Sequence, residues 1–289
     1  MRYQVCHRTV YEYGGEVAHS HHLLHLTPRE LDFQRCLGHR IALDPEPSSI
    51  RDGRDAFGNP VARLEYDRAH DRLAVVADTR VDVLPRPQRP AADAWESVRE
   101  RLSYRAAPMR AADLEACRFR MQSSHVPIKQ ALGDYAKDCL DRSRPIDAAA
   151  AALAAKIHRE FHYLPGSTTH RTPVTEVLTT RRGVCQDFAH LMIGCLRSAG
   201  LAARYVSGYV RTARAGELVG GDASHAWVSV YCPPSGWLDF DPTNDCRVGE
   251  DHVTVAWGRD FGDVSPLRGM IVGGGRHTLT VDVSVRALV

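Results

Sequence analysis

The chain has 289 residues, of which 44% are hydrophobic and 25% are charged, and its formal net charge is +2. This composition is typical of an ordinary globular protein, and the balanced charge indicates neither a nucleic acid nor an anionic membrane as partner. There is no apolar run of about 18 residues, and the N-terminal MRYQVCHRTV lacks the apolar core of a secretory signal. We therefore expect a cytoplasmic protein.

Residues 1–88 are predicted to form a β-rich N-terminal domain. Alternation starts in RYQVCHRTVYEY and is expected to end at Gly14 and Gly15, after which HHLLHLTP predicts a second strand. RCLGHRIALDP and FGNPVARLEYD each predict a strand, and DRLAVVADTRVDVL predicts a pair of strands. The three prolines of LPRPQRP, residues 84–90, predict a linker.

Residues 89–289 are predicted to be a mixture of helices and strands that ends in a strand at 277–286. Helical periodicity is found at 91–102, 113–122, 128–140, 146–161, 174–181 and 185–199. Strands are expected at 203–210, 224–231, 236–241, 254–257 and 277–286. The sequence leaves open which sheet the last strand joins.

A cysteine stands at the start of the helix predicted in RRGVCQDFAHLMIGCLRSAG, residues 181–200. Free backbone N–H groups and the helix dipole stabilise an anion at this position, which makes Cys185 a candidate nucleophile. Cys195 lies further along the apolar stripe and is expected to be a core residue. The eight cysteines contain no C-x-x-C pair, so most are expected to be reduced thiols.

A hairpin downstream offers a base and a carboxylate for this thiol. If 232–236 form the turn, Tyr231 pairs with Trp237 and Trp227 faces Asp241. His225 then lies diagonal to Asp241 on the same face of the hairpin. A carboxylate beside an imidazole fixes its tautomer and stabilises its charged form, so these two side chains can serve a cysteine nucleophile.

Other interpretations of these residues remain open. Cys185 can be a structural thiol, His225 a surface residue and Asp241 a turn former, or all three can bind a metal together with His190. The cluster HSHHLLH invites a metal site at His21, His22 and His25, but it lacks a cysteine or carboxylate at ligand spacing. We expect no metal and no cofactor, and the absence of a D-x-D-x-D-G loop predicts calcium-independent action.

The segments GVCQDFAHLMIGCLRSAGLAARYVSGYV, SHAWVSVY and GWLDFDPTN together resemble the core of the transglutaminase-like superfamily. HRTVYEY, LTPRE, DAFGNPV and DRLAVVADTRVDV resemble the N-terminal region of its bacterial members, and VAWGRDFGDVSPLRG resembles their C-terminal part. The resemblance implies an α+β fold, in which a β-rich N-terminal domain precedes a papain-like core. In that core, the helix that carries the cysteine packs on an antiparallel sheet.

The resemblance also assigns roles: Cys185 becomes the nucleophile, His225 the base and later acid, and Asp241 the orienting residue. It makes Tyr163 a candidate second oxyanion donor. Further candidates for the cleft are Gln186, Asp187 and Trp227, although Asp187 equally suits the helix dipole and Trp227 the packing of the hairpin. Arg204 and Tyr209 can line the cleft or pack in the strand. Ser229 is a departure, because many relatives are expected to have an acidic residue there.

The implied reaction is attack of the thiol on an amide of a peptide or protein, through a thioester, followed by hydrolysis or by transfer to an amine. The alternative is a catalytically silent scaffold of the same fold. The sequence leaves the substrate and the oligomeric state open.

Overall fold

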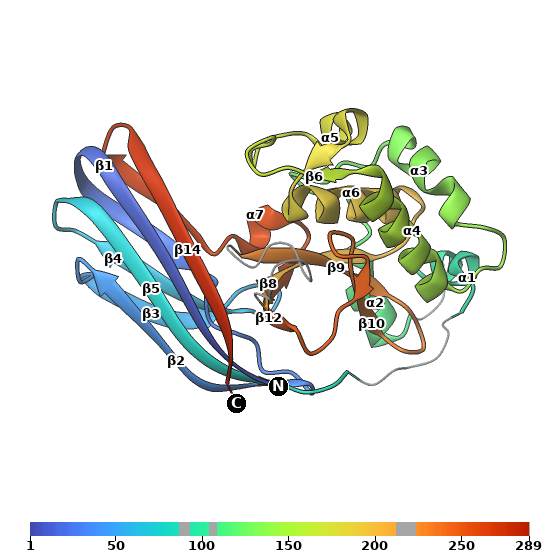
Figure 1. Ribbon diagram of the computed structural model, residues 1–289, viewed down its shortest axis with the longest axis horizontal. Coiled ribbons are helices and arrows are strands. Elements are labelled where there is room, and N and C mark those ends of the chain that lie inside the picture. Colours follow the sequence, from blue (N-terminus) through green and yellow to red (C-terminus); the bar gives the residue numbers. More distant parts are fainter. Residues whose placement is uncertain (87–92, 104–108, 212–223, 289) are drawn as a thin grey trace.

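The computed structural model describes residues 1–86, 93–103, 109–211 and 224–288. Of its two larger sheets, one forms the left half of Figure 1, and the other lies among the helices of the right half. No helix in the described ranges is long and apolar enough to cross a membrane.

The first sheet is built around one long central strand. Its strands, in the order β2-β5-β1-β4-β3 with β13 and β14 also paired to β1, are β1 (Arg2–Leu24), β2 (Gln34–Asp44), β3 (Ser49–Arg54), β4 (Pro60–Tyr66), β5 (His70–Val83), β13 (Leu267–Gly273) and β14 (His277–Leu288). Alternate side chains of β1 are buried, which is the burial that strand periodicity demands. The C-terminal strand therefore joins the N-terminal sheet: Arg2 is paired with Leu288, and the chain ends lie together in Figure 1.

Two strand predictions in this half are wrong. Gly14 and Gly15 do not end the first strand; β1 continues through them, and the first four residues of HHLLHLTP form its end. The pairing of β1 with β5 shifts register between Glu12 and Val17, so the glycines lie where β1 exchanges neighbours. DRLAVVADTRVDVL is one strand, β5, and not two, since no turn residue interrupts it. Strands β3 and β13 were not predicted.

The second sheet has the order β11-β10-β9-β8-β12. Its strands are β8 (Ala203–Val210), β9 (His225–Tyr231), β10 (Trp237–Asp241), β11 (Cys246–Arg247) and β12 (His252–Gly258). A separate short parallel pair joins β6 (His162–Tyr163) to β7 (Arg182–Gly183). The strands predicted at 203–210, 224–231, 236–241 and 254–257 are thus found as β8, β9, β10 and β12.

The helices surround this second sheet in Figure 1. They are α1 (Trp95–Arg101), α2 (Ala111–Cys117), α3 (Gln130–Ala136), the short 3₁₀ helix η1 (Lys137–Cys139), α4 (Ile146–Glu160), α5 (Val174–Thr180), α6 (Cys185–Ser198) and α7 (Phe261–Val264). Each predicted helix has a counterpart, and α7 was not predicted. Residues 87–90 of the predicted linker and 91–92 of the first predicted helix lie outside the described residues.

The two halves meet at the edge strand β12. The side-chain amide of Gln34 donates to the carbonyl oxygen of Thr254 (2.7 Å) and accepts from its N–H (2.7 Å). Asn59 does the same at Trp257, at 2.8 and 3.0 Å. These buried amides satisfy backbone groups that an edge strand would otherwise leave unpaired, so the N-terminal sheet holds β12 in place.

Candidate active site

The start of α6 is shaped by a glycine and a capping carboxylate. The Oδ2 atom of Asp187 accepts hydrogen bonds from the Val184 backbone N–H (2.8 Å) and from the Thr168 hydroxyl (2.6 Å). A Cβ atom at Gly183 would lie 2.8 Å from the Asp187 side chain, so only glycine admits this close approach. Cys185 is thereby placed at the first position of the helix, where its side chain is 8% exposed.

Helix α6 is held against β8 and β9 by its apolar face. Phe188, Leu191, Met192 and Cys195 are all buried in the main core, and Cys195 is a core residue as predicted. Burial raises the pKa of the Cys195 thiol, which makes it a poor nucleophile. All eight cysteines are free thiols. The buried face fixes the helix axis, and with it the position of Cys185 over the second sheet.

The β9–β10 hairpin has the predicted register. Trp237 is paired with Tyr231 and Phe240 with Val228. His225 begins β9 and Asp241 ends β10, and the Nε2 atom of His225 lies 2.7 Å from Oδ2 of Asp241. Both side chains are inaccessible to solvent. The hairpin therefore brings together the imidazole and the carboxylate that the sequence places 16 residues apart.

The Cys185 thiol also interacts with the His225 ring. Burial alone would lower the pKa of His225, but the charge of Asp241, the hydrogen bond to it and the Cys185 thiol together raise it well above its ordinary value. Within the described part of the chain, Nδ1 of His225 is buried and has no hydrogen bond of standard geometry.

Besides His225, several other groups donate hydrogen bonds to the carboxylate of Asp241. Its Oδ1 atom accepts from the backbone N–H groups of Thr243 (2.9 Å) and Asn244 (3.3 Å). Its Oδ2 atom also accepts from the Asn244 side chain at 2.7 Å and from Nε2 of His252 at 3.2 Å. Burial alone would raise the pKa of this carboxyl, but His225 and His252 lower it far below its usual range. Asp241 is therefore an ionised, immobile carboxylate.

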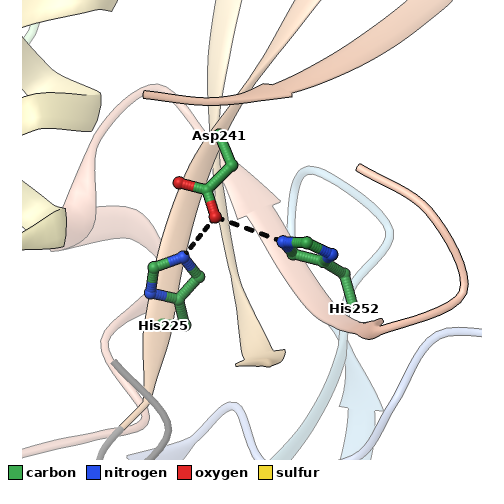
Figure 2. Close-up of side chains that lie close together, drawn as sticks. All are labelled: His225, Asp241 and His252. Atoms are coloured by element: carbon green, nitrogen blue, oxygen red, sulfur yellow. Dashed lines mark hydrogen bonds and ion pairs between the residues drawn. The ribbon is translucent and has the colours of Figure 1, made fainter. Parts of the chain in front are cut away.

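His252 was missed by the sequence analysis, which placed a strand only at 254–257. In the structure it begins β12, and Figure 2 shows Asp241 between the rings of His225 and His252. The only sequence signal is a histidine that directly precedes an alternating apolar run, which many surface strands share.

Trp227 lies beside the two histidines. Its ring centroid is 6.2 Å from that of His225 and 5.3 Å from that of His252, and its Nε1–H donates to Asp239 (3.2 Å). A Cβ atom at Gly208, on the neighbouring strand, would lie 2.5 Å from the Trp227 ring. Trp227 is completely buried, so in this structure it packs behind the imidazoles and does not line an open cleft.

The remaining candidates surround the start of α6. Tyr163 is paired with Gly183 in the short parallel sheet, and its half-buried ring packs edge-on against Phe188 at 6.4 Å. Gln186 follows the cysteine and is also half-buried. His190 points elsewhere: its Nε2 atom accepts from the Phe261 N–H (3.1 Å), and burial lowers its pKa to about 3.

Two further candidates belong to strand β8. Arg204 is buried between Trp237 and Trp257, with its guanidinium 4.2 and 3.8 Å from the ring centroids. The Tyr209 hydroxyl lies 2.9 Å from Nδ1 of His7 in the N-terminal sheet. Both are packing residues in this structure.

The two groups of metal ligands considered from the sequence differ from the group that the structure brings together. In β1 His21 is exposed while His22 is buried, and His25 bonds Asp55 (3.2 Å), so HSHHLLH forms no common site. Within the described residues, the one set of ligand atoms that converges is that of His225, Asp241 and His252, which lie within 4.8 Å of one another.

A cysteine at a helix start, beside a buried histidine–aspartate pair on a hairpin, defines the papain-like class of thiol sites. The model of the transglutaminase-like superfamily matches residues 133–242, which include all three residues. The model of the bacterial transglutaminase-like N-terminal region matches residues 3–82, which form the first sheet. The chain belongs to the transglutaminase-like superfamily, in its bacterial form with this N-terminal region.

Several known proteins are similar to all or part of this chain. The uncharacterized protein Rv2569c of Mycobacterium tuberculosis is 40% identical over 296 residues, which cover 98% of this chain and 91% of that protein. A protein-glutamine gamma-glutamyltransferase of Pseudomonas aeruginosa is 32% identical over 166 residues, 51% of this chain and 24% of that protein. A crystal structure of a candidate cysteine protease from Cytophaga hutchinsonii has a TM-score of 0.77 at 20% identity and covers 100% of this chain and 91% of that one, so the two share a fold.

Proposed function

We propose that this chain is a cysteine enzyme that acts on amide bonds of peptides or proteins through a thioester on Cys185. The observation that carries the proposal is the placement of His225: Asp241 holds its Nε2 atom at 2.7 Å, and its Nδ1 atom is left for the Cys185 thiol. The carboxylate alone would suit a structural histidine as well, so the proposal depends on the cysteine at a helix start on the other side of the ring.

The reaction follows from these positions. His225 takes the proton of Cys185, and the thiolate attacks the amide carbonyl carbon. The backbone N–H of Cys185 faces the oxyanion as one donor, and Tyr163 is the candidate for a second. Protonated His225 returns the proton to the leaving amine as the C–N bond breaks, which leaves the thioester. Water or a second amine, deprotonated by His225, then attacks the thioester and releases the thiolate.

Both outcomes of the second step are compatible with the site. The name of the Pseudomonas relative favours the side chain of glutamine as acyl donor and an amine as acceptor, whereas that of the Cytophaga protein favours hydrolysis. Because the thioester is common to the two reactions, the first test concerns the thiol and the second concerns the acceptor.

The first test is labelling with iodoacetamide, followed by intact mass and peptide mapping, on wild type, H225A and C195A. We expect Cys185 to be modified first, H225A to lose this preference, and C195A to behave as wild type because Cys195 is buried in the core. If Cys185 of the wild type reacts no faster than the other seven cysteines, the enzyme proposal fails and a scaffold role replaces it.

The second test is turnover of glutamine-containing peptides with and without a primary amine. Loss of ammonia with incorporation of the amine identifies acyl transfer, while deamidation or peptide cleavage alone identifies hydrolysis. C185A is the control, since it removes the atom that forms the thioester. No turnover in any form by a protein with a reactive Cys185 would contradict the proposed substrate class.

A further inference from the structure

The Oδ2 atom of Asp241 is shared by two histidines. It accepts from Nε2 of His225 at 2.7 Å, from the Asn244 side chain at 2.7 Å and from Nε2 of His252 at 3.2 Å. His252 is 2% exposed, and Figure 2 shows its ring on the side of the carboxylate opposite to His225. A hydrogen-bonded triad needs one histidine, so the second requires a role of its own.

The tautomer of His252 follows from its partner. An ionised carboxylate only accepts, so the Nε2 atom of His252 carries the hydrogen. Its Nδ1 atom is buried and has no partner within the described residues. The Trp227 ring meets the imidazole edge-on at 5.3 Å and limits its rotation. The side chain is therefore built to present one N–H to one oxygen.

Metal binding explains these contacts less well, although the three ligand atoms lie within 4.8 Å of one another. The Asn244 amide nitrogen is 2.7 Å from the same Oδ2 atom. A cation on that oxygen would face the positive end of the amide N–H, and it would have to displace the hydrogens of both imidazoles. A hydrogen-bonded network accounts for all three contacts of the Oδ2 atom without these costs.

We propose that His252 is a positioning residue, which holds the Oδ2 atom of Asp241 in the orientation that His225 needs to activate Cys185. The inference rests on the proposed function. Without the His252 donor, the Oδ2 atom keeps its bonds to His225 and Asn244 only, and the carboxylate turns toward Asn244. The His225 ring then loses its alignment with the thiol, although no atom of His252 touches a reacting group.

The test compares three substitutions by the rate of Cys185 alkylation near neutral pH and by the low-field proton resonance of the His225–Asp241 hydrogen bond. H252Q keeps an N–H donor near the position of Nε2, H252N carries the same amide too short to reach it, and H252F removes the donor. We expect H252N and H252F to lose about 10–100-fold in rate, as for other residues that orient a functional side chain. H252Q should remain within about threefold of wild type and retain the resonance.

The controls separate three outcomes. H7F removes another buried histidine that touches none of the triad, and it should lower the melting temperature without slowing alkylation. Equal rates in wild type and all three His252 variants would overturn the positioning role. Equal losses in H252Q and H252N would also overturn it, because they would indicate a requirement for the ring and not for the donor. A wild-type Cys185 that does not depend on His225 would instead contradict the proposed function itself.

Discussion

The Nε2 atom of His225 lies 2.7 Å from Oδ2 of Asp241, and neither side chain is exposed to solvent. In such an environment each group stabilises the charge of the other: the pKa of His225 is raised and that of Asp241 is lowered. The carboxylate therefore favours the charged imidazolium form of His225. Removing either partner leaves the other as a buried polar group without compensation, which costs about 3–5 kcal/mol of stability.

Replacement of Asp241 by asparagine should abolish most of the activity while preserving the fold. D241N removes the charge and allows the wrong tautomer of His225, an effect that reaches about 10⁴-fold in kcat for a comparable triad. We expect a similar loss in amide turnover, and Cys185 alkylation that no longer exceeds the background of the other cysteines.

Asp239 provides the matched control for D241N. It lies on the same strand and is a half-buried carboxylate, but it bonds Arg86 (2.6 Å) and Trp227 and not His225. D239N should therefore destabilise the protein without changing the pH profile of alkylation. A D241N protein with more than about a tenth of wild-type kcat would contradict the role of the carboxylate.

The hairpin and the helix that begins at Cys185 follow from local patterns in the sequence. The register of Tyr231 with Trp237 is set by the five residues of the turn, and the helix that begins at Cys185 is set by its apolar stripe and Gly200. These are short-range features, so the sequence predicts that His225 and Asp241 meet. The meeting of α6 with the hairpin is a long-range contact, and it entered the sequence analysis only through the family resemblance.

His252 could not be predicted for the same reason. β12 follows β10 and β11 in the chain, yet it lies beside β8 at the other edge of the sheet. Its distance from Asp241 depends on the course of residues 242–251 and on the packing of Trp227, neither of which has a local pattern. The continuity of β1 was missed because Gly14 and Gly15 end most strands, whereas here they mark a change of pairing partners.

The free energy of unfolding should fall in mild acid because several histidines are buried in their neutral form. Burial lowers the pKa of His7 and of His22 to about 4 and that of His190 to about 3. The unfolded chain takes up protons on these residues below about pH 6.5, while the folded chain does not until about pH 4, so the unfolded state gains stability as the pH falls. Each histidine contributes a loss of up to about 1.4 kcal/mol per pH unit.

Urea unfolding at pH values between about 7 and 5 measures this loss. H7F should reduce the pH dependence by the share of one histidine. Stability that stays constant or rises between about pH 6.5 and 5 would mean that these imidazoles are charged in the folded protein.

Gly208 should tolerate no side chain. An alanine Cβ would meet the backbone carbonyl of Val253 and lie 2.5 Å from the Trp227 ring, neither of which is the end of a flexible side chain. We expect G208A to lose about 1–3 kcal/mol or more, since overpacking at a rigid site cannot relax cheaply. Displacement of Trp227 should also slow Cys185 alkylation, because the ring contacts both imidazoles.

Gly249 is the control for this substitution, because nothing lies within 4 Å of the position of its Cβ. G249A should melt near the wild-type temperature and keep the wild-type alkylation rate. If G208A behaves like G249A, the packing of Trp227 against the histidines does not constrain the site.

Asp187 should support the reactivity of Cys185 by capping the start of helix α6. It accepts from Val184 and from Thr168, and burial raises its pKa, so a neutral side chain with an acceptor oxygen is a good substitute. We expect D187N to keep nearly all stability and reactivity. D187A leaves both donors unpaired, and the loss of an N-terminal cap costs about 0.5–2 kcal/mol. The first turn should then loosen and Cys185 alkylation should slow.

T168V separates the cap from the loop contact, because it removes only the hydroxyl that Asp187 accepts and leaves the Val184 bond in place. It should lower the melting temperature less than D187A does. If D187N is as inactive as D187A although its melting temperature equals that of wild type, the carboxylate itself takes part in the reaction as a cleft residue, and the capping explanation is insufficient.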